Sequence, residues 1–230
     1  MITVANPNLQ TKIEISPEYV SLLIIENPGE YFKTVCGLQN AMEGELSDFT
    51  FWNGTTQLQP SKIGELLLSA FSFELADRKI LSLLYKKLQN NFLNGEFIVG
   101  FNAINTQIGA FLQSLCQTVD FSLDYSELVL EDLFKACNIK PAKTYESFLE
   151  KLICYINIFT ELKNIQFFIF IGLKDILSDE NLTLLYRHCA LQKVGLLLIE
   201  SSKKRSLLPN EHAIIITEDL CEIVENFNRM

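Results

Sequence analysis

The turn that begins at Asn27 has the frame of a phosphate-binding loop but lacks its glycines. Such a loop needs glycines, so that backbone N–H groups can surround a phosphate, followed by Lys and Ser or Thr at a helix start. Lys33 and Thr34 occupy the last two positions of this pattern. Asn27 and Phe32 stand at the two glycine positions. Phe32 fills space that the backbone would need, and Glu30 would repel a triphosphate.

Nucleotide hydrolysis would also need an acid at the end of a second strand, to hold magnesium. The apolar segment 165–171 ends at Gly172, and Asp175 falls past the expected strand end. We therefore expect a protein that binds and assembles rather than catalyses. An ATP-dependent enzyme with an aberrant phosphate loop is the alternative from the enzyme class. In the simplest interpretation, Lys33 and Thr34 are ordinary residues of a first helical turn.

Oxygen-bearing side chains recur between residues 120 and 132. Five of them match positions 1, 3, 5, 7 and 12 of a calcium-binding EF-hand loop: Asp120, Ser122, Asp124, Ser126 and Glu131. Tyr125 stands where that loop requires glycine, so a true EF-hand is not expected. The structural alternative is a half-exposed strand followed by a helix, with Ser126 as its N-cap and acids in its first turn.

Basic residues form two short clusters, Lys86-Lys87 and Lys203-Lys204-Arg205. Basic pairs on helices are commonly solvated faces. The formal net charge of -9 argues against a diffuse nucleic-acid-binding surface. It still allows a local basic face, which assembly could build from a few lysines.

Short apolar runs at both ends of the chain predict the strands of one sheet. We expect strands at 20–26, 49–52, 66–68, 166–171, 194–199 and 213–216, and helices at 30–42 and at 179–189, the latter capped by Ser178. Residues 53–54, Asn-Gly, are a hairpin-type turn signal. Continuous apolar strands separated by a helix are typical of parallel strands covered on both faces.

Helical periodicity dominates the middle third. One apolar stripe comprises Ile80, Leu84, Leu88 and Phe92, and another comprises Phe97, Phe101, Ile104, Ile108, Leu112 and Leu115. Two further helices are expected at 128–137 and 145–159. We therefore predict a discontinuous α/β head, residues 1–72 and 163–230, with an inserted helical domain at 73–162.

Composition is consistent with a chain that folds on its own, since 48% of its 230 residues are apolar. No apolar run approaches the roughly 20 residues that cross a bilayer. The N-terminal segment lacks the basic start and apolar stretch of a secretory signal. We expect a cytoplasmic protein without a membrane partner.

Three segments carry a resemblance to a known family. They are FFIFIGLKDILSDENLTLLYRHCALQKVGLLLIES, LLLSAFSFELADRKILSLLYKKLQNNF and LDYSELVLEDLFKACNIK. The chain resembles, from Val20 to about Asp219, the short form of the accessory spacer-acquisition protein of type II-A CRISPR systems. The resemblance implies a P-loop-ATPase-like α/β head with a mainly parallel sheet, no active site and an inserted α-helical extension. It also implies a homotetrameric ring that binds calcium and holds double-stranded DNA in a lysine-lined channel, with linear ends preferred.

The resemblance also implies sites and partners. It implies Asp120, Asp124, Glu127 and Asp132 as calcium ligands. Ser122 and Ser126 stand where relatives can carry acids. The candidates for DNA contact are Lys33, Lys86, Lys87, Lys203, Lys204 and Arg205. The expected partners are DNA, other CRISPR adaptation proteins and the effector nuclease, in the acquisition of new spacers. An acidic adaptor that docks proteins without touching DNA is the remaining alternative.

Overall fold

The structure, a computed structural model, describes residues 1–69, 71, 73–75, 78–142 and 145–226. The chain forms two compact units. The head unit comprises residues 1–73 and 145–230, and the helical unit comprises residues 74–144. We predicted that the insertion begins at residue 73, and the helical unit begins at residue 74. Residue 72, the predicted end of the first head segment, lies outside the described residues.

The head unit is built on a six-stranded sheet with the order β10-β9-β3-β8-β7-β6. Its strands are β3 (Val20–Ile25), β6 (Gly64–Leu67), β7 (Phe167–Ile171), β8 (Gly195–Glu200), β9 (Glu211–Ile216) and β10 (Glu222–Asn226). All neighbours run parallel except β10, which pairs antiparallel with β9. Every residue of β3 and β8 is buried, as expected for central parallel strands. The predicted mainly parallel α/β fold is confirmed.

A second, antiparallel sheet with the order β2-β1-β4-β5 packs against this one. Its strands are β1 (Ile2–Ala5), β2 (Ile13–Ile15), β4 (Thr50–Asn53) and β5 (Thr56–Leu58). The predicted hairpin turn joins β4 to β5, and Gly54 takes the left-handed conformation that this turn requires, with φ of 60°. The other strands of this sheet were not predicted.

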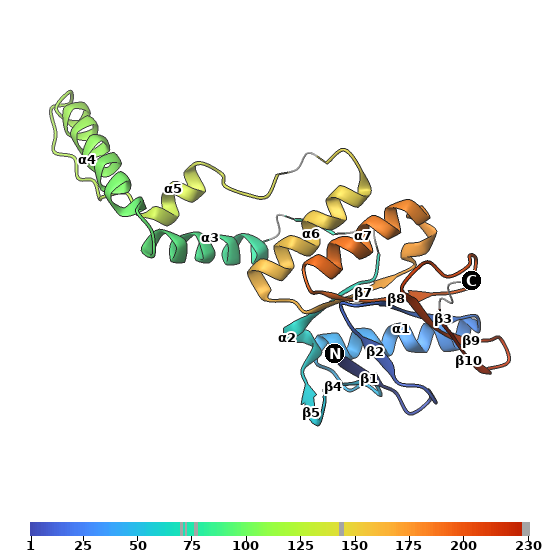
Figure 1. The fold of residues 1–230 in the computed structure, drawn as a ribbon. Helices are drawn as coiled ribbons and strands as arrows, with labels where there is room; N and C mark the ends of the chain where they lie inside the picture. Colours follow the sequence, from blue (N-terminus) through green and yellow to red (C-terminus); the bar gives the residue numbers. More distant parts are fainter. Residues whose placement is uncertain (70, 72, 76–77, 143–144, 227–230) are drawn as a thin grey trace. The chain divides into compact units, whose positions relative to one another are not determined.

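Helices cover both faces of the six-stranded sheet (Figure 1). They are α1 (Pro28–Glu43), α2 (Pro60–Ile63), α6 (Phe148–Lys163) and α7 (Asp179–Leu191), with a 3-10 turn, η1, at Leu173–Asp175. α1 and the small sheet lie on one face, while α6 and α7 lie on the other. Ser178 caps α7, as predicted, by accepting a hydrogen bond from the Asn181 N–H.

The helix expected at 145–159 belongs to the head unit rather than to the insertion. It is observed as α6, whose Tyr155 ring lies 6.1 Å from Phe168 of β7 and 4.8 Å from Phe73. Leu152 and Ile156 of the same helix are fully buried. Helical periodicity shows that one face is apolar but does not reveal which partner covers it, and here the partner is the sheet.

The helical unit contains α3 (Arg78–Leu93), α4 (Phe97–Cys116) and α5 (Leu130–Ala136). The expected strand before α5 is not formed, since residues 121–129 have no regular secondary structure and all but half-buried Leu128 are exposed. Ser126 is not an N-cap, because α5 starts later and Val129 precedes its first turn without a side-chain cap. Within the described residues, no helix combines the length and apolarity needed to cross a membrane.

Candidate functional site

The start of α1 is capped by the chain itself. The side-chain oxygen of Asn27 accepts the Glu30 N–H at 3.0 Å, and Asn27 Nδ2 donates to the Glu218 carbonyl at 3.0 Å. Pro28, next along the chain, has no N–H to offer. A phosphate at this helix start would have to displace the Asn27 oxygen from the donors that bind anions elsewhere. The local geometry thus supports the expectation that this turn does not bind a nucleotide phosphate.

Lys33 and Thr34 face different surroundings on α1. Lys33 Nζ lies 3.2 Å from Glu30 Oε2, and its side chain is 73% exposed. Thr34 is buried, whereas the Phe32 side chain is exposed. Because Lys33 is paired with an acid of its own helix, its charge is partly neutralised. Such an exposed pair is worth at most about 1 kcal/mol, so Lys33 can exchange partners.

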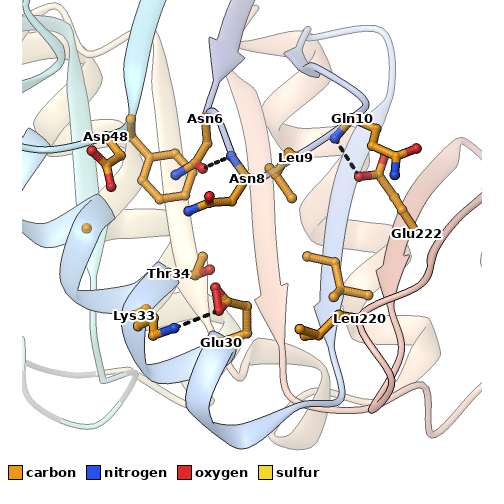
Figure 2. Close-up of a pocket in the computed structure, with 13 residues that line it drawn as sticks. Asn6, Asn8, Leu9, Gln10, Glu30, Lys33, Thr34, Asp48, Leu220 and Glu222 are labelled. Carbon is orange, nitrogen blue, oxygen red and sulfur yellow. Dashed lines mark hydrogen bonds and ion pairs between the residues drawn. The ribbon is translucent and has the colours of Figure 1, made fainter.

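A cavity of about 520 Å³ lies beside α1. It is lined by Asn6, Asn8, Leu9, Gln10, Glu30, Lys33, Thr34, Gly37, Asp48, Phe49, Ile216, Leu220 and Glu222. Figure 2 shows Asn6, Asn8 and Asp48 on one side of the cavity and Thr34, Glu30 and Lys33 on the other. Asn6 and Asn8 belong to the loop between β1 and β2, and Asp48 belongs to the segment between α1 and β4. The opposite wall is supplied by α1. Sequence reasoning missed this cavity, because β1, β2 and the loop between them, which supplies Asn6 and Asn8, were not foreseen.

The carboxyl end of β7 carries no magnesium-holding acid in the position that hydrolysis needs. Gly172 ends the strand with φ of 65°, and Asp175 lies in η1, beyond the strand as predicted. Its carboxylate lies 2.7 Å from Lys204 Nζ. Glu200, at the end of neighbouring β8, is buried and accepts the Lys174 N–H at 2.9 Å. Burial raises the pKa of Glu200 to about 7.

A buried ionic network ties η1 to β9. Lys174 Nζ lies 2.7 Å from both carboxylate oxygens of Glu211, and the Tyr186 hydroxyl donates to the same carboxylate at 2.6 Å. Burial, reinforced by the Glu211 charge, raises the pKa of Tyr186. The network fixes η1 in place. The carbonyl of Lys174 in η1 in turn accepts a hydrogen bond from Arg205. Sequence analysis passed over all three residues.

The basic loop, Lys203 to Arg205, follows β8 and is paired with acids of the same chain. Lys203 contacts Glu225 at 2.5 Å and Lys204 contacts Asp175 at 2.7 Å. Arg205 differs from both lysines, because besides Asp179 it donates to the carbonyls of residues 174 and 177. Lys203 and Lys204 are therefore available for exchange with an external anion, whereas Arg205 anchors the loop.

The other predicted DNA-contacting lysines lie elsewhere. Lys86 and Lys87 are on α3 in the helical unit, where Lys86 is exposed and Lys87 is half-buried. Lys33 and the basic loop belong to the head unit. The six candidates thus comprise two exchangeable lysines in one loop, an anchoring arginine, one lysine on α1 and two on α3.

The four acids assigned to calcium are all exposed in the helical unit. Asp120, Asp124 and Glu127 lie in the irregular segment before α5, and Asp132 lies in the first turn of α5. Asp124 accepts its neighbour's N–H at 2.9 Å, and Asp132 lies 3.8 Å from Lys135. Across the part of the chain that the structure describes, no three His, Cys, Asp or Glu side chains are grouped so as to hold a metal ion. Asp120, Asp124, Glu127 and Asp132, all of which the structure describes, therefore do not come together as such a group, and their assignment to calcium stays a prediction.

The helix α4 exposes a broad apolar surface. Its 20 residues include no charged side chain and none is buried. The exposed apolar residues are Phe97, Ile98, Val99, Ile104, Phe111 and Leu115, and Val99 is 79% exposed. Exposed apolar surface of this extent on a helix typically marks an interaction site.

Comparison with known proteins agrees with the fold and adds a family. A nucleotide-free ATP-binding cassette from an ABC transporter matches with a TM-score of 0.50 and 13% identity, covering 98% of this chain and 92% of that chain. The ADP conformation of another ABC-transporter cassette matches with a TM-score of 0.46 and 12% identity, covering 95% and 87%. At 13% identity, the first of these matches shows a shared fold and nothing more. No curated protein matches the chain.

The family model of the CRISPR-associated protein (Cas_Csn2) matches residues 42–220, which is more than half of the chain. The match includes the helical unit, the basic loop and every strand of the six-stranded sheet except β3 and β10. The matched region begins after the turn at residues 27–34. The missing phosphate loop is therefore inferred from the residues of this chain and not from the family match. On the strength of this match, the chain belongs to the Cas_Csn2 family of CRISPR-associated proteins.

Proposed function

We propose that this protein serves CRISPR adaptation as a non-catalytic component that binds the ends of double-stranded DNA and assembles into a homotetrameric ring. The observation that carries the proposal is the family match over residues 42–220. It is supported by the helix start at Asn27, which is closed by its own side chain and has no glycine cradle for a triphosphate. No bond in DNA is cut in this proposal.

DNA contact would centre on Lys203 and Lys204. Both side chains are partly exposed, and within the described residues their ion pairs are with Glu225 and Asp175, whose side chains are 41% and 44% exposed. A DNA phosphate can replace such a partner at little cost, because exposed ion pairs contribute at most about 1 kcal/mol. Phosphate contacts carry no sequence information and release counterions. Binding should therefore be independent of base sequence and should weaken steeply as salt rises.

Assembly would use the exposed face of α4, covered by a second copy of the chain. A chain with a formal charge of -9 repels its own copies over most of its surface. The 20 residues of α4 carry no charge, so two such faces meet without placing like charges together. Covering the face also removes large apolar side chains such as Phe97 and Phe111 from water, which favours association.

Calcium dependence is a further part of the proposal. Its support is the density of exposed carboxylates at Asp120, Asp124, Glu127 and Asp132. One chain does not group three of them, so calcium binding would require the segment before α5 to rearrange or a second copy to add ligands. Calorimetric titration of calcium into the protein tests this part separately. An Asp124→Asn/Glu127→Gln variant should lose the binding, and a titration without heat in the unaltered protein would remove calcium from the proposal.

The decisive experiment compares linear duplex DNA with covalently closed circular DNA of the same sequence and length. A ring that threads DNA loads from an end, so the linear form should bind and the closed circle should compete poorly. Linearising the circle with a single cut should restore competition. Equal competition by both forms would refute threading, and no salt-dependent binding of either form, with and without calcium, would refute DNA binding itself and favour a protein-docking adaptor.

A further inference from the structure

The cavity beside α1 is unlike a nucleotide site in its charge. Three carboxylates, Glu30, Asp48 and Glu222, line it together with one ammonium group, Lys33, which leaves a formal charge of -2. A triphosphate would enter a cavity of its own sign. The charge of the lining instead favours a positively charged ligand.

The three carboxylates differ in the hydrogen bonds and ion pairs that they already form. Glu222 accepts the N–H groups of Gln10 and Thr11 at 2.8 and 2.7 Å, so it holds the β1–β2 loop in place. Glu30 contacts Lys33 through one oxygen, at 3.2 Å. Asp48 is exposed, and within the described residues its side chain forms no ion pair or hydrogen bond. Asp48 is therefore the charge most available to a ligand.

The cavity is also lined by a largely buried threonine whose hydroxyl group is open to the cavity and not sealed in the protein interior. Thr34 is 9% exposed and lines the cavity, and within the described residues its hydroxyl forms no hydrogen bond. Buried hydroxyl groups are normally hydrogen-bonded to protein or water. The Asn8 side-chain amide, across the cavity in Figure 2, likewise forms no hydrogen bond within the described part of the chain. Both groups can orient a ligand that brings hydrogen-bond donors.

We propose that this cavity binds a small organic cation carrying an ammonium or guanidinium group, rather than a nucleoside triphosphate. Asp48 pairs with the cationic group, and Thr34 and Asn8 accept its remaining N–H donors. The volume of about 520 Å³ is within the range of small-molecule sites. Apolar side chains, Leu9 and Phe49 among them, cover the methylene chain of such a ligand.

Lys33 has a role in this site opposite to that of a phosphate-loop lysine. Its ammonium group lies against Glu30 and competes with the ligand for that carboxylate. Removing Lys33 frees Glu30 and makes the lining more negative. Lys33→Ala should therefore strengthen binding of the organic cation, whereas the same substitution would weaken binding of ATP.

The test is calorimetric titration of the full chain, without DNA, using agmatine as the cationic probe and ATP as the anionic one. We expect saturable agmatine binding that Asp48→Asn weakens about tenfold, the scale of one charge-assisted hydrogen bond. Glu45→Gln is the matched control, because it removes one exposed carboxylate that does not line the cavity. It should change the agmatine affinity less than twofold.

Two further variants complete the test. Thr34→Val keeps the shape of the side chain and should weaken agmatine binding, while Lys33→Ala should strengthen it several-fold. The proposal is overturned by agmatine binding that is absent up to millimolar concentrations, by equal effects of Asp48→Asn and Glu45→Gln, or by ATP binding that Lys33→Ala abolishes. The experiment does not involve DNA or assembly, so its outcome is independent of the proposed function.

Discussion

Lys174 Nζ lies 2.7 Å from each carboxylate oxygen of Glu211, and both residues are buried. The pair joins the segment after β7 to the start of β9, across the central strands of the sheet. The same segment provides the carbonyl of Lys174 to Arg205, so the buried pair indirectly holds the basic loop. A buried charge pair of this kind is costly to break, because the remaining partner loses its compensation.

Lys174→Met should therefore destabilise the protein by about 3–5 kcal/mol, since it leaves Glu211 charged and unpaired in the interior. Urea unfolding followed by circular dichroism measures the change. The double variant Lys174→Met/Glu211→Leu should recover part of the loss, because both charges are then gone. A loss below about 1 kcal/mol in the single variant would contradict the buried pairing.

Glu200 should make stability fall as pH rises through neutrality. Burial raises its pKa from 4.5 to about 7 in the folded chain, so between these values the folded state holds a proton that the unfolded state has released. The resulting stability is fully present below about pH 4.5 and is lost as pH passes about 7, and it amounts to at most about 3 kcal/mol.

Glu200→Gln should remove this pH-dependent part of the free energy of unfolding. The variant should therefore lose less stability between pH 5 and pH 8 than the unaltered protein does. Unfolding curves at both pH values give the comparison. Glu180→Gln, on the exposed first turn of α7, is the control and should leave the pH dependence unchanged. An identical pH dependence in Glu200→Gln and the unaltered protein would show that Glu200 titrates normally.

Lys203→Ala/Lys204→Ala should weaken binding of linear duplex DNA and lower the slope of log affinity against log salt by about two, one for each lost phosphate contact. Stability should change little, because both lysines form exposed ion pairs. Fluorescence anisotropy over a salt series measures both quantities. Lys12→Ala, an exposed cation on the loop between β1 and β2, is the control. Equal slopes in the double variant and this control would exclude the basic loop as a DNA contact.

Val99→Glu/Phe111→Glu should disrupt self-association, because it places charges on the face of α4 that the proposal covers with a second copy. Both side chains are largely exposed in one chain, so the fold should survive. Sedimentation velocity should show a smaller assembly than that of the unaltered protein. Asn102→Glu/Gln113→Glu, also exposed on α4, adds the same charge at polar positions and serves as the control. An assembly that withstands the first variant but not the second would place the interface on the polar side of the helix.

The sequence by itself determined the central strands and the helices that follow them. Val20–Ile25 and Gly195–Glu200 are mostly apolar runs that are long enough to be recognised without knowledge of their neighbours, and they form buried parallel strands. The Ser178 cap was also predictable, because its partner N–H lies three residues away. The missing phosphate loop could be read for the same reason, since its geometry depends on consecutive residues.

Tertiary structure decided whatever depends on residues distant in sequence. The strand β2 is only three residues long and carries too little pattern to be recognised before β1 pairs with it. Lys174, Glu200 and Glu211 look like ordinary solvated charges, and only the alignment of β7, β8 and β9 brings them into the interior. The closely spaced acids around Asp124 show the converse, because proximity along an irregular segment did not group them for a metal. Local periodicity fixes an element and its apolar face, but burial and charge pairing are fixed by the partners that the fold brings to that face.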